Sequence, residues 1–395
     1  MWESKTLLIV TKHLTLTLFI GLAFWGCEDR QEDGTTTFDK TYDGIQGHSV
    51  QPTTDGGYII TGYTGGNGYG YDICLIKTDF KGNEEWNKTF GGNGISMGWS
   101  IWQTTDGGYI ISGHTDHIGN GGSDIWLIKT NSAGVEEWSQ TFGGISTEGG
   151  NSVQQTIDGG YIIAGYTGSF GNGEEDIWLI KTNSLGAEEW SQTFGGSNKE
   201  VGSSIQQTTD EGFIITGRTS SYGNGKIDIW LLKTDLEGNE EWSQTFGGNE
   251  NDWGHSVKQT SEGGYIITGY TDSFGNGGSD IYLIKTNSFG VEEWSQTFGG
   301  SGMDNGNSVQ QTIDGGFIIS GSKSENGIYA WLIKTNSFGI EEWSQIFDGS
   351  GVSFGTSVQQ TEDDGYIITG SKWMADNTGN NSVWLMKTDS EGDYK

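Results

Sequence analysis

The sequence contains almost no proline and little cysteine. Pro52 is the single proline among 395 residues, and Cys27 and Cys74 are the two cysteines. Proline-rich linkers between domains are therefore excluded, and so is a framework of several disulfides that could replace a hydrophobic core. A disulfide could form only if Cys27 takes part. The fold must then be held together by packing.

Basic residues are also scarce. The chain has 20 Lys and Arg against 52 Asp and Glu, which gives a formal net charge of −32. DNA or RNA would meet long-range repulsion, and the basic surface that nucleic-acid binders need is missing. Nucleic acid is therefore excluded as a partner, and we interpret most of the acidic residues as a solvated surface.

What the sequence has in abundance is repetition. An acidic residue, glycine and an aromatic residue recur along the chain at spacings of 51, 52, 52, 52, 52 and 49 residues. The aromatic positions are Tyr58, Tyr109, Tyr161, Phe213, Tyr265, Phe317 and Tyr366. Such a period indicates an array of one supersecondary unit.

One unit predicts four short strands and no helix. In the third copy the strands cover 152–156, 161–165, 176–182 and 188–194. The turns between them contain Asp-Gly-Gly or Asn-Ser-x-Gly, and glycine supplies the positive φ that tight turns require. The second and third strands are almost continuously apolar, as expected for strands covered on both faces. The first is rich in Ser and Gln, which suits the wall of a hydrated channel.

This order of polarity predicts an all-β, seven-bladed β-propeller with four antiparallel strands per blade. The last copy stops after its third strand, whereas residues 38–44 align with the fourth strand at 86–92. We therefore expect strand 38–42 to complete the C-terminal blade and to close a single domain over 38–395. An open solenoid is the structural alternative.

The repeated motifs TFGG, SVQQT, DGGYII, DIWLIK and G-EEW resemble the bacterial and archaeal β-propeller repeats called SBBP repeats. The resemblance covers residues 38–395. It implies the propeller architecture and carries no shared chemistry.

The first 37 residues follow another pattern. A basic start and the apolar stretch 14–25 predict an export signal over 1–26, because a membrane-spanning helix needs about 20 apolar residues. Gly26-Cys27 resembles a bacterial lipobox, and we expect an acidic flexible linker over 27–37. Its acidic residues resemble the export signal of Bacteroidetes surface lipoproteins, with a plain solvated spacer as the alternative. We expect lipidation at Cys27 and an exported protein at the outer membrane or cell surface. Ordinary signal cleavage and an uncleaved anchor remain alternatives.

Several repeated residues are predicted to be scaffold. A lysine ends every third strand, and counting through the turn places Lys285 opposite Glu292 as an ion pair. Cys74 stands where a later blade has Trp126, so we expect an inert thiol in the core. The paired glutamates recur on outer strands, which argues against acid and base catalysis by them.

Function is expected where the blades differ, on the face with the longer connections. The residues that break the repeat there are Trp99, His114, His117, Arg218, Tyr222, Trp253, His255, Trp373 and Met374. They predict a face that binds a protein or a glycan. Trp99, Trp253 and Trp373, together with the loop aromatics Phe170, Tyr222 and Phe274, could stack on a ligand or could instead be buried anchors of their loops.

Metal and enzyme hypotheses have less support. Asp124, Asp176, Asp228 and Asp280 follow Gly-rich and Asn-rich loops and could bind Ca²⁺, with strand capping as the alternative. The His114 and His117 pair lacks a third ligand, so no zinc site is predicted. We expect a monomeric binding module without a cofactor. A polysaccharide hydrolase or lyase with a site at the channel mouth is the alternative function.

Overall fold

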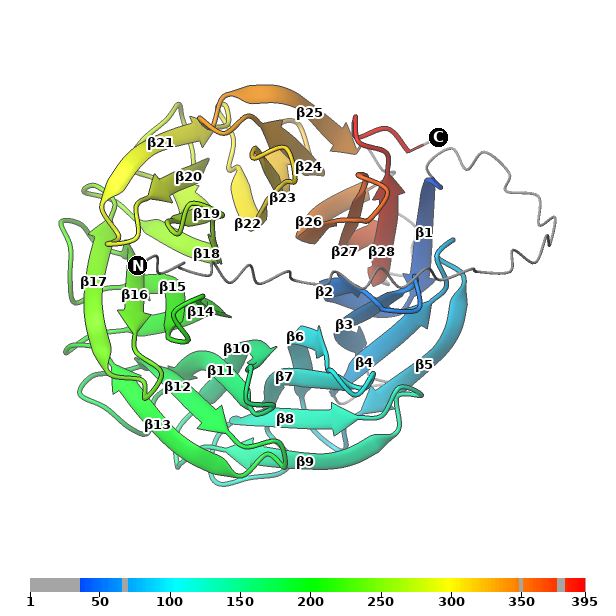
Figure 1. The fold of residues 1–395 in the computed structure, drawn as a ribbon, viewed down its shortest axis with the longest axis vertical. Coiled ribbons are helices and arrows are strands. Elements are labelled where there is room, and N and C mark those ends of the chain that lie inside the picture. The colour runs from blue at the N-terminus through cyan, green and yellow to red at the C-terminus, as the bar shows by residue number, and fades with distance from the viewer. Residues whose placement is uncertain (1–35, 66–69, 348–350, 375–380, 395) are drawn as a thin grey trace, which may run out of the picture. The chain divides into compact units, whose positions relative to one another are not determined.

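The computed structural model describes residues 36–65, 70–347, 351–374 and 381–394. They form seven antiparallel sheets of four strands each, arranged as blades around a central axis (Figure 1). The predicted seven-bladed β-propeller is confirmed. Thr35–Lys395 is one compact unit. No helix in the described ranges is long and apolar enough to cross a membrane.

The strands fall into four concentric classes. The innermost are β2 (Ile45–Pro52), β6 (Ser96–Gln103), β10 (Glu148–Gln155), β14 (Glu200–Gln207), β18 (Asp252–Gln259), β22 (Asn305–Gln311) and β26 (Gly351–Gln360). The second strands are β3 (Tyr58–Gly65), β7 (Tyr109–Thr115), β11 (Tyr161–Thr167), β15 (Phe213–Thr219), β19 (Tyr265–Thr271), β23 (Phe317–Ser324) and β27 (Tyr366–Met374). The third are β4 (Tyr71–Thr78), β8 (Asp124–Thr130), β12 (Asp176–Thr182), β16 (Asp228–Thr234), β20 (Asp280–Thr286), β24 (Ile328–Thr335) and β28 (Asn381–Thr388). The outermost are β5 (Glu84–Phe90), β9 (Glu136–Phe142), β13 (Glu188–Phe194), β17 (Glu240–Phe246), β21 (Glu292–Phe298), β25 (Glu341–Phe347) and β1 (Phe38–Asp43).

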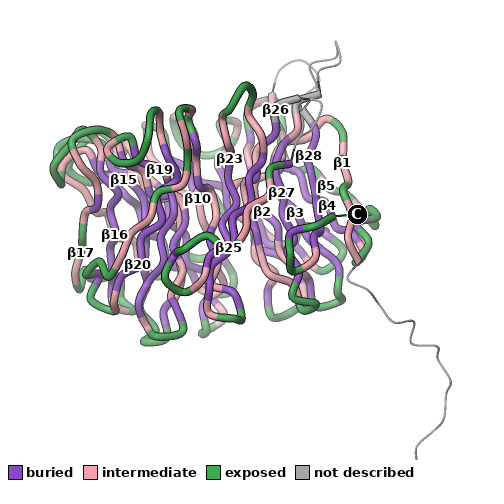
Figure 2. The backbone as a smooth tube through the Cα atoms, turned by 90° about the horizontal axis from the view of Figure 1, so that it is seen from above, coloured by how far each residue is buried: buried purple, intermediate pink, exposed green. Residues whose placement is uncertain are grey.

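The hydrophobic core lies between blades. One cluster joins Ile162 and Leu179 of the third blade to Ile215 and Trp230 of the fourth, and Trp190 packs against it. Burying one such aliphatic side chain contributes about 1.5–3 kcal/mol. Figure 2 shows buried chain through the middle of the strands and exposed chain at the turns. Each blade is therefore stabilised by its neighbours, which explains why the apolar strands are the second and third.

The two ends of the ring meet in one sheet. β1 pairs with β28 in the register Phe38 to Lys387, and Phe38 takes the place that Trp190 has opposite Lys181. Phe38 and Tyr42 pack against the cluster that joins the first and last blades. The predicted closure by strand 38–42 is confirmed.

A β-bulge interrupts every pair of first and second strands at the same place. In the third blade the register steps from Gly150 and Gly165 to Ser152 and Ala164, so Asn151 is the extra residue. A Cβ atom at Gly165 would overlap the carbonyl oxygen of Gly149, which explains the glycine there. The seven bulge residues are His48, Trp99, Asn151, Ser203, His255, Asn307 and Thr356.

A second bulge corrects one predicted ion pair. Between β20 and β21 the register steps from Lys285 and Trp294 to Thr286 and Glu292, so Glu293 is the extra residue. Lys285 Nζ lies 2.8 Å from Glu293, and the predicted pairing with Glu292 was wrong. Counting residues through the turn could not include the inserted residue.

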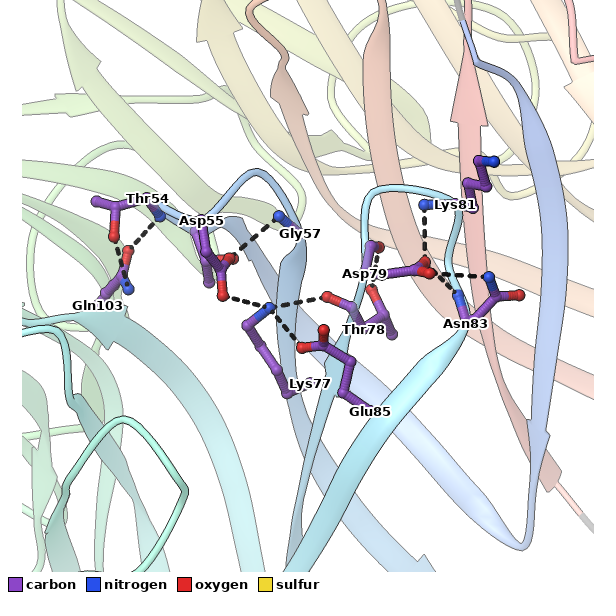
Figure 3. Close-up of polar contacts among 11 residues, drawn as sticks. Thr54, Asp55, Gly57, Lys77, Thr78, Asp79, Lys81, Asn83, Glu85 and Gln103 are labelled. Carbon is purple, nitrogen blue, oxygen red and sulfur yellow. Dashed lines mark hydrogen bonds and ion pairs between the residues drawn. The ribbon is translucent and has the colours of Figure 1, made fainter. Parts of the chain in front are cut away.

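The repeated lysines connect the short turns of one face. Lys77 Nζ lies 3.0 Å from Asp55 and 3.1 Å from Glu85, and it donates a hydrogen bond to the Thr78 carbonyl (Figure 3). Lys77 is 2% exposed, so its ammonium group is buried between these oxygens. We call the face with these turns the short-turn face, and the opposite face the long-loop face.

Serine and glutamine side chains link each innermost strand to its neighbours. Ser100 Oγ accepts a hydrogen bond from the Val153 backbone N–H at 3.1 Å, and Gln154 Oε1 accepts one from the Gln207 N–H at 2.7 Å. Gln103 Oε1 accepts from Thr54 N–H, as Figure 3 shows. Their abundance in the first strand therefore has a structural reason besides the hydration of the channel.

Candidate functional site

A cavity of about 500 Å³ lies around the bulge residues of all seven blades. Besides the seven bulge residues, it is lined by Gln46, Asn305, Ser322, Phe354 and Ser371. The bulges lie near the start of the innermost strands, which is the end reached from the longer connections. We call this space the mouth cavity, because it lies at the long-loop end of the channel.

Several bulge residues also hold neighbouring blades together. Asn151 Nδ2 donates to the Gly202 carbonyl at 2.8 Å, and Asn307 Nδ2 donates to the Gly355 carbonyl at 2.8 Å. His255 Nδ1 lies 3.0 Å from the Gly306 carbonyl. A carbonyl only accepts, so we assign the proton of His255 to Nδ1.

An aromatic cluster forms one side of the mouth, in the first two blades. Trp99 Nε1 donates to His114 Nδ1 at 3.0 Å, and the His48 ring lies 4.4 Å from Trp99 and 5.3 Å from Tyr63 between ring centroids. Burial lowers the pKa of His48 to about 4 and also lowers the pKa of His114. Both imidazoles are therefore neutral at pH 7 and can donate or accept hydrogen bonds.

A second cluster lies behind His255. The Arg218 guanidinium lies 3.7 Å from the centroid of Trp253, and Trp253 stacks on Tyr270 at 5.6 Å. The His255 ring approaches Tyr270 at 5.8 Å. Burial is the largest influence on His255 and lowers its pKa. A cation over an aromatic face contributes about 0.5–1 kcal/mol or more, so Arg218 is held close to the mouth.

The structure therefore brings some of the predicted ligand-binding residues together at the mouth cavity. Trp99 and His255 line the mouth cavity, and His114, Arg218 and Trp253 support it. These five residues lie in strands rather than in loops. Sequence reasoning missed the other bulge residues, although their variation at one position of the repeat was visible.

The other predicted residues lie elsewhere. His117 follows β7, where its Nδ1 lies 2.6 Å from Thr115 Oγ1 and 3.2 Å from Ser96 Oγ. No interaction joins it to His114 within the described ranges. Trp373 pairs through its backbone with Val352. The side chains of Trp373 and Met374 lie outside the described residues.

The loop aromatics fold back onto their own blades. Tyr222 donates to the Gly195 carbonyl at 3.0 Å and its ring lies 5.3 Å from Trp230. Phe170 contacts Trp178 at the same distance of 5.3 Å between ring centroids. Phe274 contacts Tyr282 at 5.6 Å. The three rings are nevertheless 44–47% exposed, so they are not the buried anchors of the first interpretation, and stacking on a ligand stays a prediction.

The four aspartates proposed for Ca²⁺ start the third strands and are about 1% exposed. Asp176 Oδ2 accepts hydrogen bonds from the N–H groups of Asn172 and Gly173, which is the predicted capping role. Asp176 Oδ1 has no hydrogen-bond partner among the described residues, and both it and Glu200 Oε2 lie next to Gly195. Equivalent pairs are Asp124 with Glu148, Asp228 with Asp252 and Asp280 with Asp304. In the described part of the chain no three metal-binding side chains come together.

Cys74 is buried, in agreement with the predicted core position, and it forms no disulfide within the described part of the chain. Burial raises the pKa of its thiol to about 12. The reactive thiolate is therefore suppressed at neutral pH.

A second space, the inner cavity of about 270 Å³, lies further along the channel. Its wall contains the serines and glutamines of the innermost strands, together with Trp102 and Lys258. These two residues replace a glutamine of the repeat and were not among the predicted site residues. Their departure from the SVQQT motif was the signal that could have revealed them.

Comparison with known proteins supports the fold. No family model matches the chain, and no curated relative matches it. The structure is similar to the Pan2 WD40 domain of Neurospora crassa, with a TM-score of 0.52 at 10% identity over 86% of this chain and 88% of that one. It is also similar to YCF48 bound to D1 peptide, with a TM-score of 0.51 at 11% identity over 90% and 96% of the two chains.

Proposed function

We propose that the ring is a binding module and that its ligand enters the mouth cavity. The observation that carries this proposal is a contrast within the repeat. The residue after each bulge is serine in all seven blades, whereas the bulge itself is His, Trp, Asn, Ser, His, Asn or Thr. A constant scaffold that presents different side chains to one cavity is the usual arrangement of a recognition site.

The proposed ligand is a segment of another protein. The cavity offers neutral imidazoles, amides and hydroxyl groups beside the Trp99 ring, and such groups suit the backbone and side chains of a peptide. The similarity to YCF48 bound to D1 peptide supports this choice at the level of the fold. A glycan is the second candidate, because Trp99 and Asn151 line the same cavity and the Trp99 ring could stack on a sugar.

We further propose that the ring is exported and attached to a membrane by lipid at Cys27. The support is the sequence pattern of 1–37, which lies outside the described residues. Labelling with a fatty acid in the native host tests it. We expect Cys27→Ser to lose the label, and undiminished label on that variant contradicts the proposal.

Binding is tested with peptide and glycan arrays on the purified ring. We expect Trp99→Asn to weaken binding at least about tenfold, as for central interface aromatics, while folding normally because Asn151 and Asn307 occupy the equivalent positions. The control is Phe289→Ala on the short-turn face, where Phe289 is 71% exposed. Equal binding by all three proteins contradicts the mouth as the site. Release of reducing ends from a bound polysaccharide would instead support the hydrolase or lyase.

A further inference from the structure

Most serine and glutamine side chains of the inner cavity accept a backbone N–H with their oxygen, and no described residue accepts from their donor hydrogens. Four glutamines of the wall accept a backbone N–H from the next blade. They are Gln51, Gln154, Gln206 and Gln310. A backbone N–H only donates, so these contacts fix Oε1 toward the protein and leave the Nε2 hydrogens without a described acceptor.

The serines of the wall behave in the same way. Ser152 Oγ accepts from Ile205 N–H at 3.2 Å, and Ser308 Oγ accepts from Val358 N–H at 3.3 Å. Their hydroxyl hydrogens remain available, because a hydroxyl group donates as well as accepts. The scaffold therefore produces a channel wall that is rich in hydrogen-bond donors.

Lys258 adds a positive charge to this wall. No described residue accepts a hydrogen bond from its ammonium group or forms an ion pair with it. Lys233 in the preceding blade differs, because it lies 3.1 Å from Asp210 and 2.9 Å from Glu241. Burial lowers the pKa of Lys258, so its charged form is held in the cavity at a cost.

We propose that the inner cavity binds one oxyanionic group, such as the carboxylate of a small ligand, at Lys258. Charge-assisted hydrogen bonds from the ammonium and amide groups would satisfy both the anion and the uncompensated lysine. The volume of about 270 Å³ suits a small molecule, and Trp102 supplies an apolar side to the same space. The net charge of −32 opposes the approach of anions, so binding depends on these local donors.

This site is independent of the mouth cavity, and its test differs. Acetate and sulfate are titrated into the full ring by calorimetry in a chloride-free buffer. We expect saturable binding of at least one anion, and a loss of at least about tenfold in Lys258→Gln, as for a hydrogen bond to a charged group. The control is Lys226→Gln, since Lys226 is exposed and paired with Glu250 at 2.6 Å.

Folding of Lys258→Gln is checked by its melting temperature. Glutamine occupies this position in five other blades, so the variant should melt no lower than the wild type. Addition of the bound anion should raise the melting temperature of the wild type and of Lys226→Gln only. Equal anion binding by wild type and Lys258→Gln overturns the proposal, and so does the absence of saturable binding of both anions.

Discussion

The aspartates on the two faces of the ring have neighbours of opposite charge. On the short-turn face, burial alone would raise the pKa of Asp106, but hydrogen bonds from Thr104 and Lys129 lower it to about 2. On the long-loop face, burial raises the pKa of Asp124, and the nearby Glu148 raises it further. One face neutralises its carboxylates with a buried lysine, whereas the other places two carboxyl groups side by side.

This difference separates a face that is nearly constant along the ring from a face that varies. The lysine network recurs with nearly the same distances along the ring, from 2.8 Å in Lys334 with Asp314 to 3.1 Å in Lys233 with Asp210. The long-loop face has different residues at equivalent positions, and pairs of carboxyl groups lie close together there. We infer that the short turns fix the blades, which lets the opposite end of each innermost strand vary.

The largest effect is expected from breaking the bulge that shapes the long-loop end. Gly165→Ala would force a Cβ atom into the Gly149 carbonyl oxygen, and we expect a loss of about 3 kcal/mol in unfolding free energy. Urea unfolding measures it. The control is Gly168→Ala, where the nearest atom to a Cβ is 3.3 Å away. Similar stability of both variants would show that the bulge can relax.

Breaking the short-turn face should have a smaller effect. Lys233→Met keeps the aliphatic stem but leaves Asp210 and Glu241 unpaired. These carboxylates are about half exposed, so we expect a loss of about 1–2 kcal/mol rather than the full effect of a buried pair. Urea unfolding compares it with Lys199→Met, in which an exposed lysine is changed. A loss no greater than that of the control would contradict a structural role.

The carboxyl pairs of the long-loop face should become less stabilising as pH rises. This is the opposite of what the lowered aspartate pKa values on the short-turn face predict. Burial, followed by the charge of Asp252, raises the pKa of Asp228 above its ordinary value of 3.8. A group with a raised folded pKa stabilises the protein at low pH, and this contribution is lost as pH rises through that pKa. We therefore expect Asp228→Asn to raise the melting temperature at pH 7, by an effect of about 1 kcal/mol or less.

The advantage of Asp228→Asn should decrease as pH falls toward the ordinary aspartate pKa of about 3.9, and it should vanish well below that pH, where aspartate is protonated in both the folded and unfolded states. The Ca²⁺ hypothesis makes a different prediction for the same variant. If Ca²⁺ binds at these pairs, its addition raises the melting temperature of the wild type more than that of Asp228→Asn, which lacks one of four equivalent pairs. Calorimetry with and without Ca²⁺ separates the two explanations.

The smallest effect is expected at Pro52, in the first blade, where the two ends of the ring meet. Pro52 stands where Gln103 accepts a hydrogen bond from the turn of the preceding blade. Pro52→Gln supplies that acceptor and a backbone N–H, so we expect a gain of about 0.5 kcal/mol after the loss of proline rigidity. Thermal unfolding measures it, with Gln103→Pro as the reverse change. A destabilised Pro52→Gln would show that the proline conformation is itself required there.

Periodicity was sufficient to predict the blades, their strand order and the closure by β1, because each depends on local pattern. It was insufficient for the bulges, since an inserted residue changes the register without changing the repeat length. Glu293 was therefore overlooked as the partner of Lys285. The other bulge, between the first and second strands, hid Asn151 and His48 as channel residues. Trp99 and His255 were identified as departures from the repeat, whereas the equivalent histidine His48 was overlooked.

The closing strand also determines where force acts on the molecule. β1 is joined to the preceding N-terminal segment, and it is attached to the last blade through Trp384 Nε1 with Asp39 at 2.6 Å and Lys372 with Asp39 at 3.0 Å. A tether attached ahead of Phe38 would load this strand before any other. Under tension β1 would then separate from β28 and open the ring, while the remaining blades stay intact.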